Sequence, residues 1–306
     1  MTSPELLAPT VARSAGALVA EAATVLRDAG TPSARLDAEL LVGHSFGRDR
    51  AWLRAHPEAE LDAAAVQDLA GWVHRRAAGE PIAYIRGFKE WLSVRVATDR
   101  RALIPRPETE LLAEAATSEI AGRLVRDDEL LQAWDVGTGC GAIALALALR
   151  FRPAIVLGRL RLEASDLSPE ALELAAENLS RHGVSRLVTL ACGDLLEPAA
   201  MPGRRADIVV ANLPYLTSDE VATGVGSLAW EPARAIDGGV DGLDHVRRLI
   251  RELPTGLTPG GVALLEIGRG QAQAVRSEIA SLPVRAAVTT LPDLAGVERV
   301  IRVALL

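Results

Sequence analysis

A short polar segment, Asn212-Leu213-Pro214-Tyr215, directly follows an apolar run at residues 207–211. Such a run, rich in Ile and Val, is typical of a buried central strand in a parallel sheet. In open α/β sheets, ligands bind beyond the carboxyl ends of the strands. The segment would therefore bring an amide side chain, a backbone carbonyl and an aromatic ring to a binding site, where they could hold a planar, nitrogen-containing group.

The chemistry that such a segment could support is methylation of an amide nitrogen. That nitrogen is a poor nucleophile, because its lone pair is delocalised into the carbonyl group. Attack on a sulfonium methyl group needs two acceptors that hold the amide hydrogens, and the Asn212 side-chain oxygen and the Leu213 carbonyl are predicted to be these acceptors. Pro214 restricts Leu213 to an extended conformation, and Tyr215 could stack on the substrate. The structural alternative is an ordinary turn after a buried strand.

A glycine-rich turn links an expected strand at residues 131–135 to an expected helix at 142–150. Its members are Gly137, Thr138, Gly139, Cys140 and Gly141. Alternate glycines let the chain turn tightly and let a ligand approach the backbone. The spacing differs from the dinucleotide fingerprint, whose last glycine stands one position later. Such a turn can also serve strand–helix geometry alone.

Two later strand ends add acidic residues to this turn. Asp166 lies 31 residues after Asp135 and could accept both hydroxyls of a ribose. Asp194 could accept the exocyclic amine of an adenine, while Leu195 packs on the ring. Each residue alone would more often cap or turn the chain. Three strand ends of this kind together predict a nucleoside-cofactor site.

Composition limits the remaining function classes. The 33 basic and 40 acidic residues give a net charge of -7, which disfavours a protein that binds nucleic acid stably. No apolar run approaches the roughly 20 residues of a membrane span, and no secretory signal pattern is visible. Two cysteines indicate a reducing compartment, the cytoplasm. The scattered histidines and distant cysteines predict no metal site.

The order of patterns predicts a helical front region followed by an α/β domain. In residues 1–88, Ser33 is expected to cap one helix, and Gly79 and Pro81 to end a second. Residues 82–85 and 91–96 suggest short strands that could pair as a hairpin. The spacing alone favours a bundle that packs on the main domain, and the alternative is a substrate-recognition cap.

From about residue 101 a βαβ rhythm begins. Strands are expected at residues 131–135, 160–165, 187–190, 207–211 and 262–267, and helices at 142–150, 169–181, 243–257 and 271–280. Further apolar stretches lie at 286–290 and 297–303. The segment at 103–110, in which two prolines flank an arginine, is either a rigid strap over the site or a link between domains.

The ordered set of motifs resembles the bacterial release-factor glutamine methyltransferases, the PrmC/HemK family. The resemblance covers nearly the whole chain, and the segments that carry it are residues 79–84, 103–110, 135–141, 212–215, 231–232, 242–243 and 294–300. It implies a seven-stranded, Rossmann-like class I methyltransferase sheet with an antiparallel last strand, and a small N-terminal helical domain. The implied domains are 1–88 for substrate recognition, 89–100 as a hairpin linker and 101–306 for methyl transfer.

The resemblance also implies the reaction and its site. The donor would be S-adenosylmethionine, and the acceptor the glutamine side chain in the Gly-Gly-Gln motif of class I peptide-chain release factors. Carried over to this sequence, residues 137–141, Asp166, Leu195 and Asn212 would contact the donor, and residues 212–215 would hold the glutamine. A cytoplasmic monomer is expected.

One position departs from the family pattern. The usual loop is Asn-Pro-Pro-Tyr, and here Leu213 takes the second position. The backbone carbonyl is retained, whereas the fixed φ of proline is lost. Asn-Leu-Pro-Tyr is also similar to the loop of ribosomal RNA adenine dimethyltransferases. An RNA adenine methyltransferase and a non-catalytic, donor-binding interaction protein therefore remain alternatives.

Overall fold

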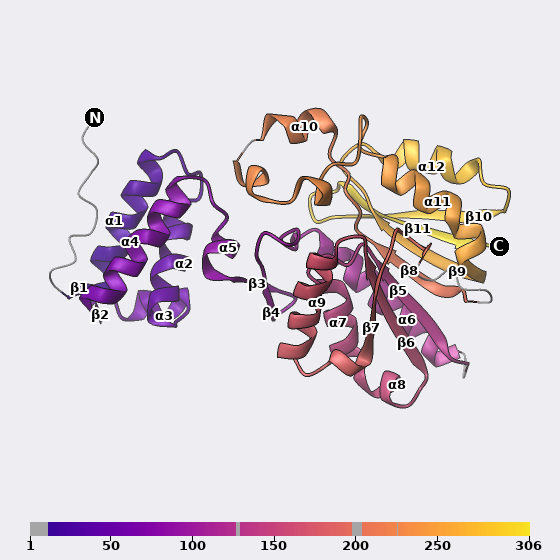
Figure 1. Cartoon of the computed structure of the whole chain (residues 1–306), viewed down its shortest axis with the longest axis horizontal. Helices are drawn as coiled ribbons and strands as arrows, with labels where there is room; N and C mark the ends of the chain where they lie inside the picture. The colour runs from indigo at the N-terminus through magenta and orange to yellow at the C-terminus, as the bar shows by residue number, and fades with distance from the viewer. Residues whose placement is uncertain (1–11, 127–128, 198–203, 225) are drawn as a thin grey trace. The chain divides into compact units, whose positions relative to one another are not determined.

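A computed structural model describes residues 12–126, 129–197, 204–224 and 226–306, and the chain divides into two compact units after Gly87. We call Met1–Gly87 the front unit and Phe88–Leu306 the sheet unit. Figure 1 shows helices throughout the front unit and a central sheet flanked by helices in the sheet unit. Within the described residues, no helix combines the length and apolarity needed to cross a bilayer.

The front unit is a helical bundle with one short strand ladder. Its core is formed by apolar residues at helical spacing, such as Leu18, Ala22 and Leu26, which are buried on one face. The ladder pairs Arg13 with Leu61 in antiparallel fashion. The elements are β1 (Arg13–Ser14), α1 (Ala15–Asp28), α2 (Ala34–Phe46), α3 (Arg50–Ala55), β2 (Glu60–Leu61), α4 (Ala63–Ala77) and α5 (Ile82–Arg86).

Two expectations for this unit were wrong. Ile82–Arg86 is the helix α5 and not a strand, because Pro81 starts it with an extended backbone and Gly87 ends it in the left-handed conformation. Ser33 stands at the start of α2, but its side chain makes no capping hydrogen bond. Its backbone, at φ -101° and ψ 27°, lacks the extended conformation that an N-cap side chain requires.

The sheet unit contains a seven-stranded sheet in the order β10-β11-β9-β8-β5-β6-β7. Strands β9, β8, β5, β6 and β7 run parallel, and β11 is antiparallel to both of its neighbours, as the resemblance implies. The strands are β5 (Leu131–Val136), β6 (Leu160–Asp166), β7 (Val188–Cys192), β8 (Ala206–Ala211), β9 (Leu257–Glu266), β10 (Ala286–Pro292) and β11 (Glu298–Leu305).

Helices cover both faces of this sheet (Figure 1). Alternation along β8 turns Ile208 and Val210 to one face and Val209 and Ala211 to the other. The first face packs on α6, α7 and α9, and the second on α11 and α12. The helices are α6 (Thr109–Arg126), α7 (Ala142–Arg150), α8 (Arg152–Val156), α9 (Pro169–Arg181), α10 (Ser218–Thr223), α11 (Asp244–Gly256) and α12 (Ala272–Ala280), with short 3-10 turns η1 (Ser185–Leu187), η3 (Gly226–Trp230) and η4 (Ala233–Ala235).

A hairpin of β3 (Phe88–Trp91) and β4 (Val94–Ala97) begins the sheet unit, and one buried amide joins it to the main sheet layer. The Asn178 side chain, on α9, accepts a hydrogen bond from the Ala97 N–H at 2.7 Å. Its Nδ2 donates to the carbonyls of Ala97 at 3.1 Å and Cys140 at 2.8 Å. A single fully buried side chain therefore connects the hairpin, helix α9 and the glycine-rich turn.

Replacing Asn178 with Ala should destabilise the sheet unit strongly. The variant leaves one backbone donor and two carbonyls buried without their partner, and each such group costs roughly 1–3 kcal/mol. We expect the free energy of unfolding, measured by urea denaturation, to fall by about 3 kcal/mol or more. Gln273→Ala, at an exposed amide on α12, should change it by less than about 0.5 kcal/mol. Equal effects of the two variants would contradict this role.

Candidate active site

The strand order reverses between β5 and β8, which are neighbours in the sheet although residues 137–205 separate them in the chain. From β5 the chain proceeds outward through β6 and β7, and it then returns to β8 on the other side. The loops that leave β5 and β8 therefore diverge, and ligands bind in the crevice that such a switch point leaves open. The glycine-rich turn follows β5 and the Asn212 segment follows β8.

The glycine-rich turn has left-handed backbone at each of its glycines, with φ +71° at Gly137, +55° at Gly139 and +78° at Gly141. A Cβ on Gly137 would lie 2.9 Å from Cδ2 of Leu213, and a Cβ on Gly141 would lie 2.9 Å from that of Ala175. Gly139 has no atom closer than 4.0 Å to its Cβ position, so it faces open space. Glycine is thus required for backbone conformation at all three positions, and only Gly139 leaves room for a ligand.

Asp135, at the end of β5, lies buried beneath this turn. Its Oδ2 accepts hydrogen bonds from the Thr138 hydroxyl at 2.6 Å and the Ala144 N–H at 3.0 Å, while Oδ1 has no partner in the described part of the chain. Burial raises the pKa of the Asp135 carboxyl to about 6. Burial also raises the pKa of the Cys140 thiol to about 12, so this cysteine remains a thiol and fills space in the turn.

Asp166 ends β6 and faces the turn. Its two oxygens accept from the backbone N–H groups of Gly139 and Ser168, each at 2.8 Å. Burial raises the pKa of the Asp166 carboxyl, against the opposing effects of these N–H donors and of the Arg234 charge. Each carboxylate oxygen has a second lone pair, so the group can still accept from a pair of vicinal hydroxyls.

Asp194 and Leu195 follow β7. The Asp194 carboxylate accepts a hydrogen bond from the Arg248 guanidinium on α11. This bond occupies one of the acceptor sites that were expected to bind an adenine amine. Leu195 has φ +46°, a left-handed backbone that is strained for a branched side chain. Such strain is typical of functional sites.

Asn212 directly follows β8, and its carboxamide has a defined orientation. Nδ2 donates to the hydroxyl of Thr109, the first residue of α6, at 3.0 Å. This bond leaves the Asn212 Oδ1 available as an acceptor. Leu213 is buried against the Gly137 turn, which holds its backbone in place.

The segment at residues 103–110, which leads into α6 and which we call the strap, is anchored by Glu231. The Glu231 side chain is fully buried. Glu231 accepts from the Ile104 N–H at 3.0 Å and forms an ion pair with Arg106 at 2.5 Å. The indole of Trp91 donates to the Arg106 carbonyl at 2.9 Å. These contacts lie within the sheet unit, so the segment acts as a strap within that unit.

The strap and the strand ends surround a cavity of about 220 Å³. Ten of the twelve predicted site residues line it: Gly137, Thr138, Gly139, Cys140, Asp166, Asp194, Leu195, Asn212, Leu213 and Pro214. Gly141 and Tyr215 do not, since Gly141 packs on Ala175 and the Tyr215 ring lies against Gly268. The binding roles of all twelve remain predictions, although the cavity brings most of them together.

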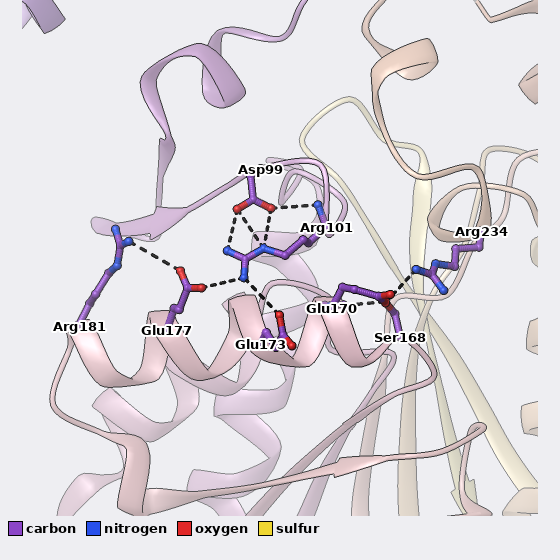
Figure 2. A network of polar contacts seen from close by, with 9 residues as sticks. Asp99, Arg101, Ser168, Glu170, Glu173, Glu177, Arg181 and Arg234 are labelled. Atoms are coloured by element: carbon purple, nitrogen blue, oxygen red, sulfur yellow. Dashed lines mark hydrogen bonds and ion pairs between the residues drawn. The ribbon is translucent and has the colours of Figure 1, made fainter.

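Ion pairs along α9 border the cavity (Figure 2). Arg101, which lines the cavity, pairs with Asp99 at 2.7 Å and with Glu177 on α9 at 2.7 Å. At the start of the helix, Glu170 accepts from the Ser168 hydroxyl at 2.7 Å and from Arg234 at 3.1 Å. These exposed pairs contribute little stability, and their effect is to fix two cations at the rim.

The backbone of Tyr215 is held in place by the Gln271 side chain. The Gln271 side chain donates to the carbonyls of Tyr215 at 2.9 Å and Gly242 at 3.2 Å, and it accepts from the Gly268 N–H at 2.7 Å. A Cβ on Gly242 would lie 2.2 Å from the Tyr215 carbonyl oxygen, so glycine is required there. One amide thus ties the end of the Asn212 segment to two neighbouring loops.

A buried carboxyl group lies beside the same segment. Glu266 ends β9 and is 1% exposed. Burial raises the pKa of its carboxyl to about 7, although the nearby hydroxyls of Thr109 and Tyr215 and the Arg299 charge favour the ionised form. Burial likewise raises the pKa of the Tyr215 phenol to about 12, so the tyrosine stays neutral.

The sheet and its site define a class I methyltransferase, whose methyl donor is S-adenosylmethionine. The open space above Gly139 and the remaining lone pairs of Asp166, both on the cavity wall, fit a ligand that carries a ribose. A family model described as a methyltransferase domain matches residues 133–229, and one described as the PrmC N-terminal domain matches residues 17–87.

Relatives of known family identify the chain more closely. The release factor glutamine methyltransferase of Xylella fastidiosa is 40% identical, over 87% of this chain and 91% of that protein. The enzyme of the same name from Deinococcus radiodurans is 39% identical, over 93% and 96%. The chain belongs to the release factor glutamine methyltransferase family. A solved structure of the hMettl16 catalytic domain in complex with MAT2A 3'UTR hairpin 1 shares the fold alone, with a TM-score of 0.50, 15% identity and coverage of 78% and 79%.

Sequence reasoning assigned no individual role to several residues of this site, although two of them, Thr109 and Glu231, lie in segments that carry the family resemblance. Thr109 and Glu231 act on Asn212 and on the strap from more than 100 residues away in the chain. Arg234 and Glu266 show no local pattern that separates them from surface residues. Among the described residues, no group of His, Cys, Asp and Glu side chains is arranged to hold a metal ion.

Replacing Asp166 with Asn should weaken donor binding. The amide loses the charge and one of the acceptors that the Gly139 and Ser168 N–H groups use, and a hydrogen bond to a charged group contributes about 1.5–3 kcal/mol. We expect the Kd for S-adenosylmethionine, measured by calorimetry, to rise about 10- to 100-fold. Glu173→Gln, on the exposed side of α9, should leave it unchanged. An unaltered Kd in the Asp166 variant would remove this residue from the donor site.

The buried carboxyl of Glu266 should make stability depend on pH. Its pKa is about 7 in the folded chain, against an ordinary value of 4.5, so folding favours the protonated form. Its stabilising contribution is present at acid pH and is lost as the pH rises toward and through 7. Compared with Glu266→Gln, the wild-type melting temperature should therefore fall by several degrees between pH 5 and pH 8. A difference between the two proteins that is constant with pH would contradict the raised pKa.

Proposed function

We propose that this chain transfers a methyl group from S-adenosylmethionine to the side-chain amide nitrogen of the glutamine in the Gly-Gly-Gln motif of class I peptide-chain release factors. The observation that carries the proposal is the fixed carboxamide of Asn212 on the wall of the cavity that the glycine-rich turn also lines. Membership of the release factor glutamine methyltransferase family supports the choice of substrate.

The donor and the residues of the cavity have separate roles in the proposed reaction. The donor, when bound, supplies an electrophilic methyl group on a sulfonium centre. Asn212 Oδ1 and the Leu213 carbonyl accept the two hydrogens of the substrate amide, which turns the nitrogen lone pair toward the donor. Gln271 holds the Tyr215 carbonyl, and the Tyr215 ring, which is not part of the cavity lining, is proposed to stack on the substrate where it enters and to exclude water. The proton leaves after the methyl group arrives, so no general base is needed beforehand.

The front unit is proposed to recognise the release factor. The match of residues 17–87 to the PrmC N-terminal domain supports this assignment. The enzyme is proposed to act as a cytoplasmic monomer, because its substrates work in translation there. Stable binding to nucleic acid is not expected, given the net charge of -7.

Incubation with the donor and a class I release factor, followed by peptide mass spectrometry, tests the proposal. One added methyl group on the Gly-Gly-Gln glutamine is expected, and none on a release factor whose glutamine is replaced by alanine. Methylation of ribosomal RNA adenine in a parallel reaction would favour the alternative suggested by Asn-Leu-Pro-Tyr. Donor binding without any product would favour a non-catalytic protein.

In the same assay, Asn212→Ala should lower kcat by about 100-fold or more, because the substrate amide loses an acceptor that orients it. The matched control is Asp219→Asn, an exposed position a few residues further along the chain. Its kcat should equal that of the wild type. Full activity in the Asn212 variant would refute the role assigned to this residue.

A further inference from the structure

The end of strand β9 carries a carboxyl group that the steps above do not use. Glu266 is 1% exposed, and neither of its oxygens has a hydrogen-bond partner among the residues that the structure describes. A buried polar group without hydrogen bonds costs free energy, and most buried polar groups in folded proteins are bonded. A carboxyl retained at such a position needs a functional explanation.

The register of the sheet places Glu266 beside the substrate-binding segment. Strands β8 and β9 run parallel with Ala211 opposite Leu265, so the next residues, Asn212 and Glu266, lie at neighbouring strand ends. The buried residue Thr109 links the two side chains. Its hydroxyl accepts a hydrogen bond from Asn212 Nδ2 and lies beside the Glu266 carboxyl.

The direction of the Asn212–Thr109 bond decides what Glu266 can do. A hydroxyl has a single proton, and because the Thr109 oxygen accepts from Asn212, its own proton can be donated to a second acceptor. The Tyr215 hydroxyl also lies beside the Glu266 carboxyl. A carboxylate accepts at both oxygens, whereas the protonated acid uses one oxygen as a donor. Only the ionised form can therefore accept one hydroxyl at each of its two oxygens.

We propose that Glu266 is a positioning residue whose carboxylate accepts the Thr109 and Tyr215 protons and thereby holds the Asn212 carboxamide in its substrate-binding orientation. The inference rests on the proposed function and adds a residue to its site. Fixing Thr109 as an acceptor toward Asn212 keeps Asn212 Oδ1 turned to the substrate. Protonation of Glu266 removes one of the two acceptors and loosens the arrangement.

The groups that surround this carboxyl set the pH at which it ionises. The positive charge of Arg299, on β11, favours ionisation of Glu266. The same guanidinium also forms an ion pair with Asp293 at 3.0 Å. Glu108, immediately before α6, opposes ionisation, and Tyr215 stays neutral. Burial is the largest influence and raises the pKa to about 7. The arrangement should therefore assemble as the pH rises through neutrality.

The test is the pH dependence of release-factor methylation by the full chain at saturating donor. Wild-type kcat should rise about tenfold between pH 6 and pH 8, as a group of pKa near 7 ionises. The kcat of Glu266→Gln should not change with pH and should equal the low kcat of the wild type at acid pH. Its Kd for the donor should be unchanged. Glu298→Gln, on the adjacent strand β11, should keep the wild-type profile. An inflection that persists in Glu266→Gln would overturn the proposal.

A double-mutant cycle separates positioning from general destabilisation. Thr109→Val breaks the same chain of hydrogen bonds, so Glu266→Gln added to it should lower kcat by less than twofold further. Losses that multiply would overturn the proposal. Wild-type enzyme that gives no methylated release factor at any pH would instead refute the proposed function, and this inference with it.

Discussion

The reversal of strand order between β5 and β8 is the constraint on which the rest of the structure depends. Adjacent parallel strands whose connections leave in opposite directions must open a crevice at their carboxyl ends. The crevice receives the glycine-rich turn from one strand and the Asn212 segment from the other. The contact between Gly137 and Leu213 shows how closely the two loops meet.

Contacts between distant segments make this crevice rigid. Asn178 bonds the glycine-rich turn to the hairpin and to α9. Glu231 holds the strap, and Gln271 holds the backbone of Tyr215. These groups are largely withdrawn from water, where an unmade hydrogen bond is costly. The loops that would bind donor and substrate are therefore held by side-chain hydrogen bonds, in addition to the backbone hydrogen bonds between the strands of the sheet.

Local patterns allowed much of the sheet unit to be predicted. The apolar run of β8 and the glycine-rich turn are each recognisable within ten residues of sequence. The turn and the Asn212 segment lie at the carboxyl ends of their strands, as expected. The helix at Ile82–Arg86 was missed because its apolar residues fit a strand equally well, and Pro81 and Gly87 decided the outcome.

Other parts of the site depend on tertiary proximity. Thr109 and Asn212 are 103 positions apart, and nothing in either neighbourhood indicates their bond. Glu266 ends an apolar strand and resembles any solvent-facing carboxylate until the register places it beside Asn212. Leu213, at the position where the family pattern has Pro, is buried and lies close to Gly137, a contact that spacing could not indicate.

Asn212 and Leu213 are proposed to hold the substrate amide in front of the donor. A crystal structure of the full chain with S-adenosylhomocysteine and a Gly-Gly-Gln peptide measures this directly. The glutamine nitrogen should lie within hydrogen-bonding distance of Asn212 Oδ1 and of the Leu213 carbonyl, with the donor sulfur facing that nitrogen. A glutamine bound elsewhere, or a sulfur turned away from Asn212, would contradict it.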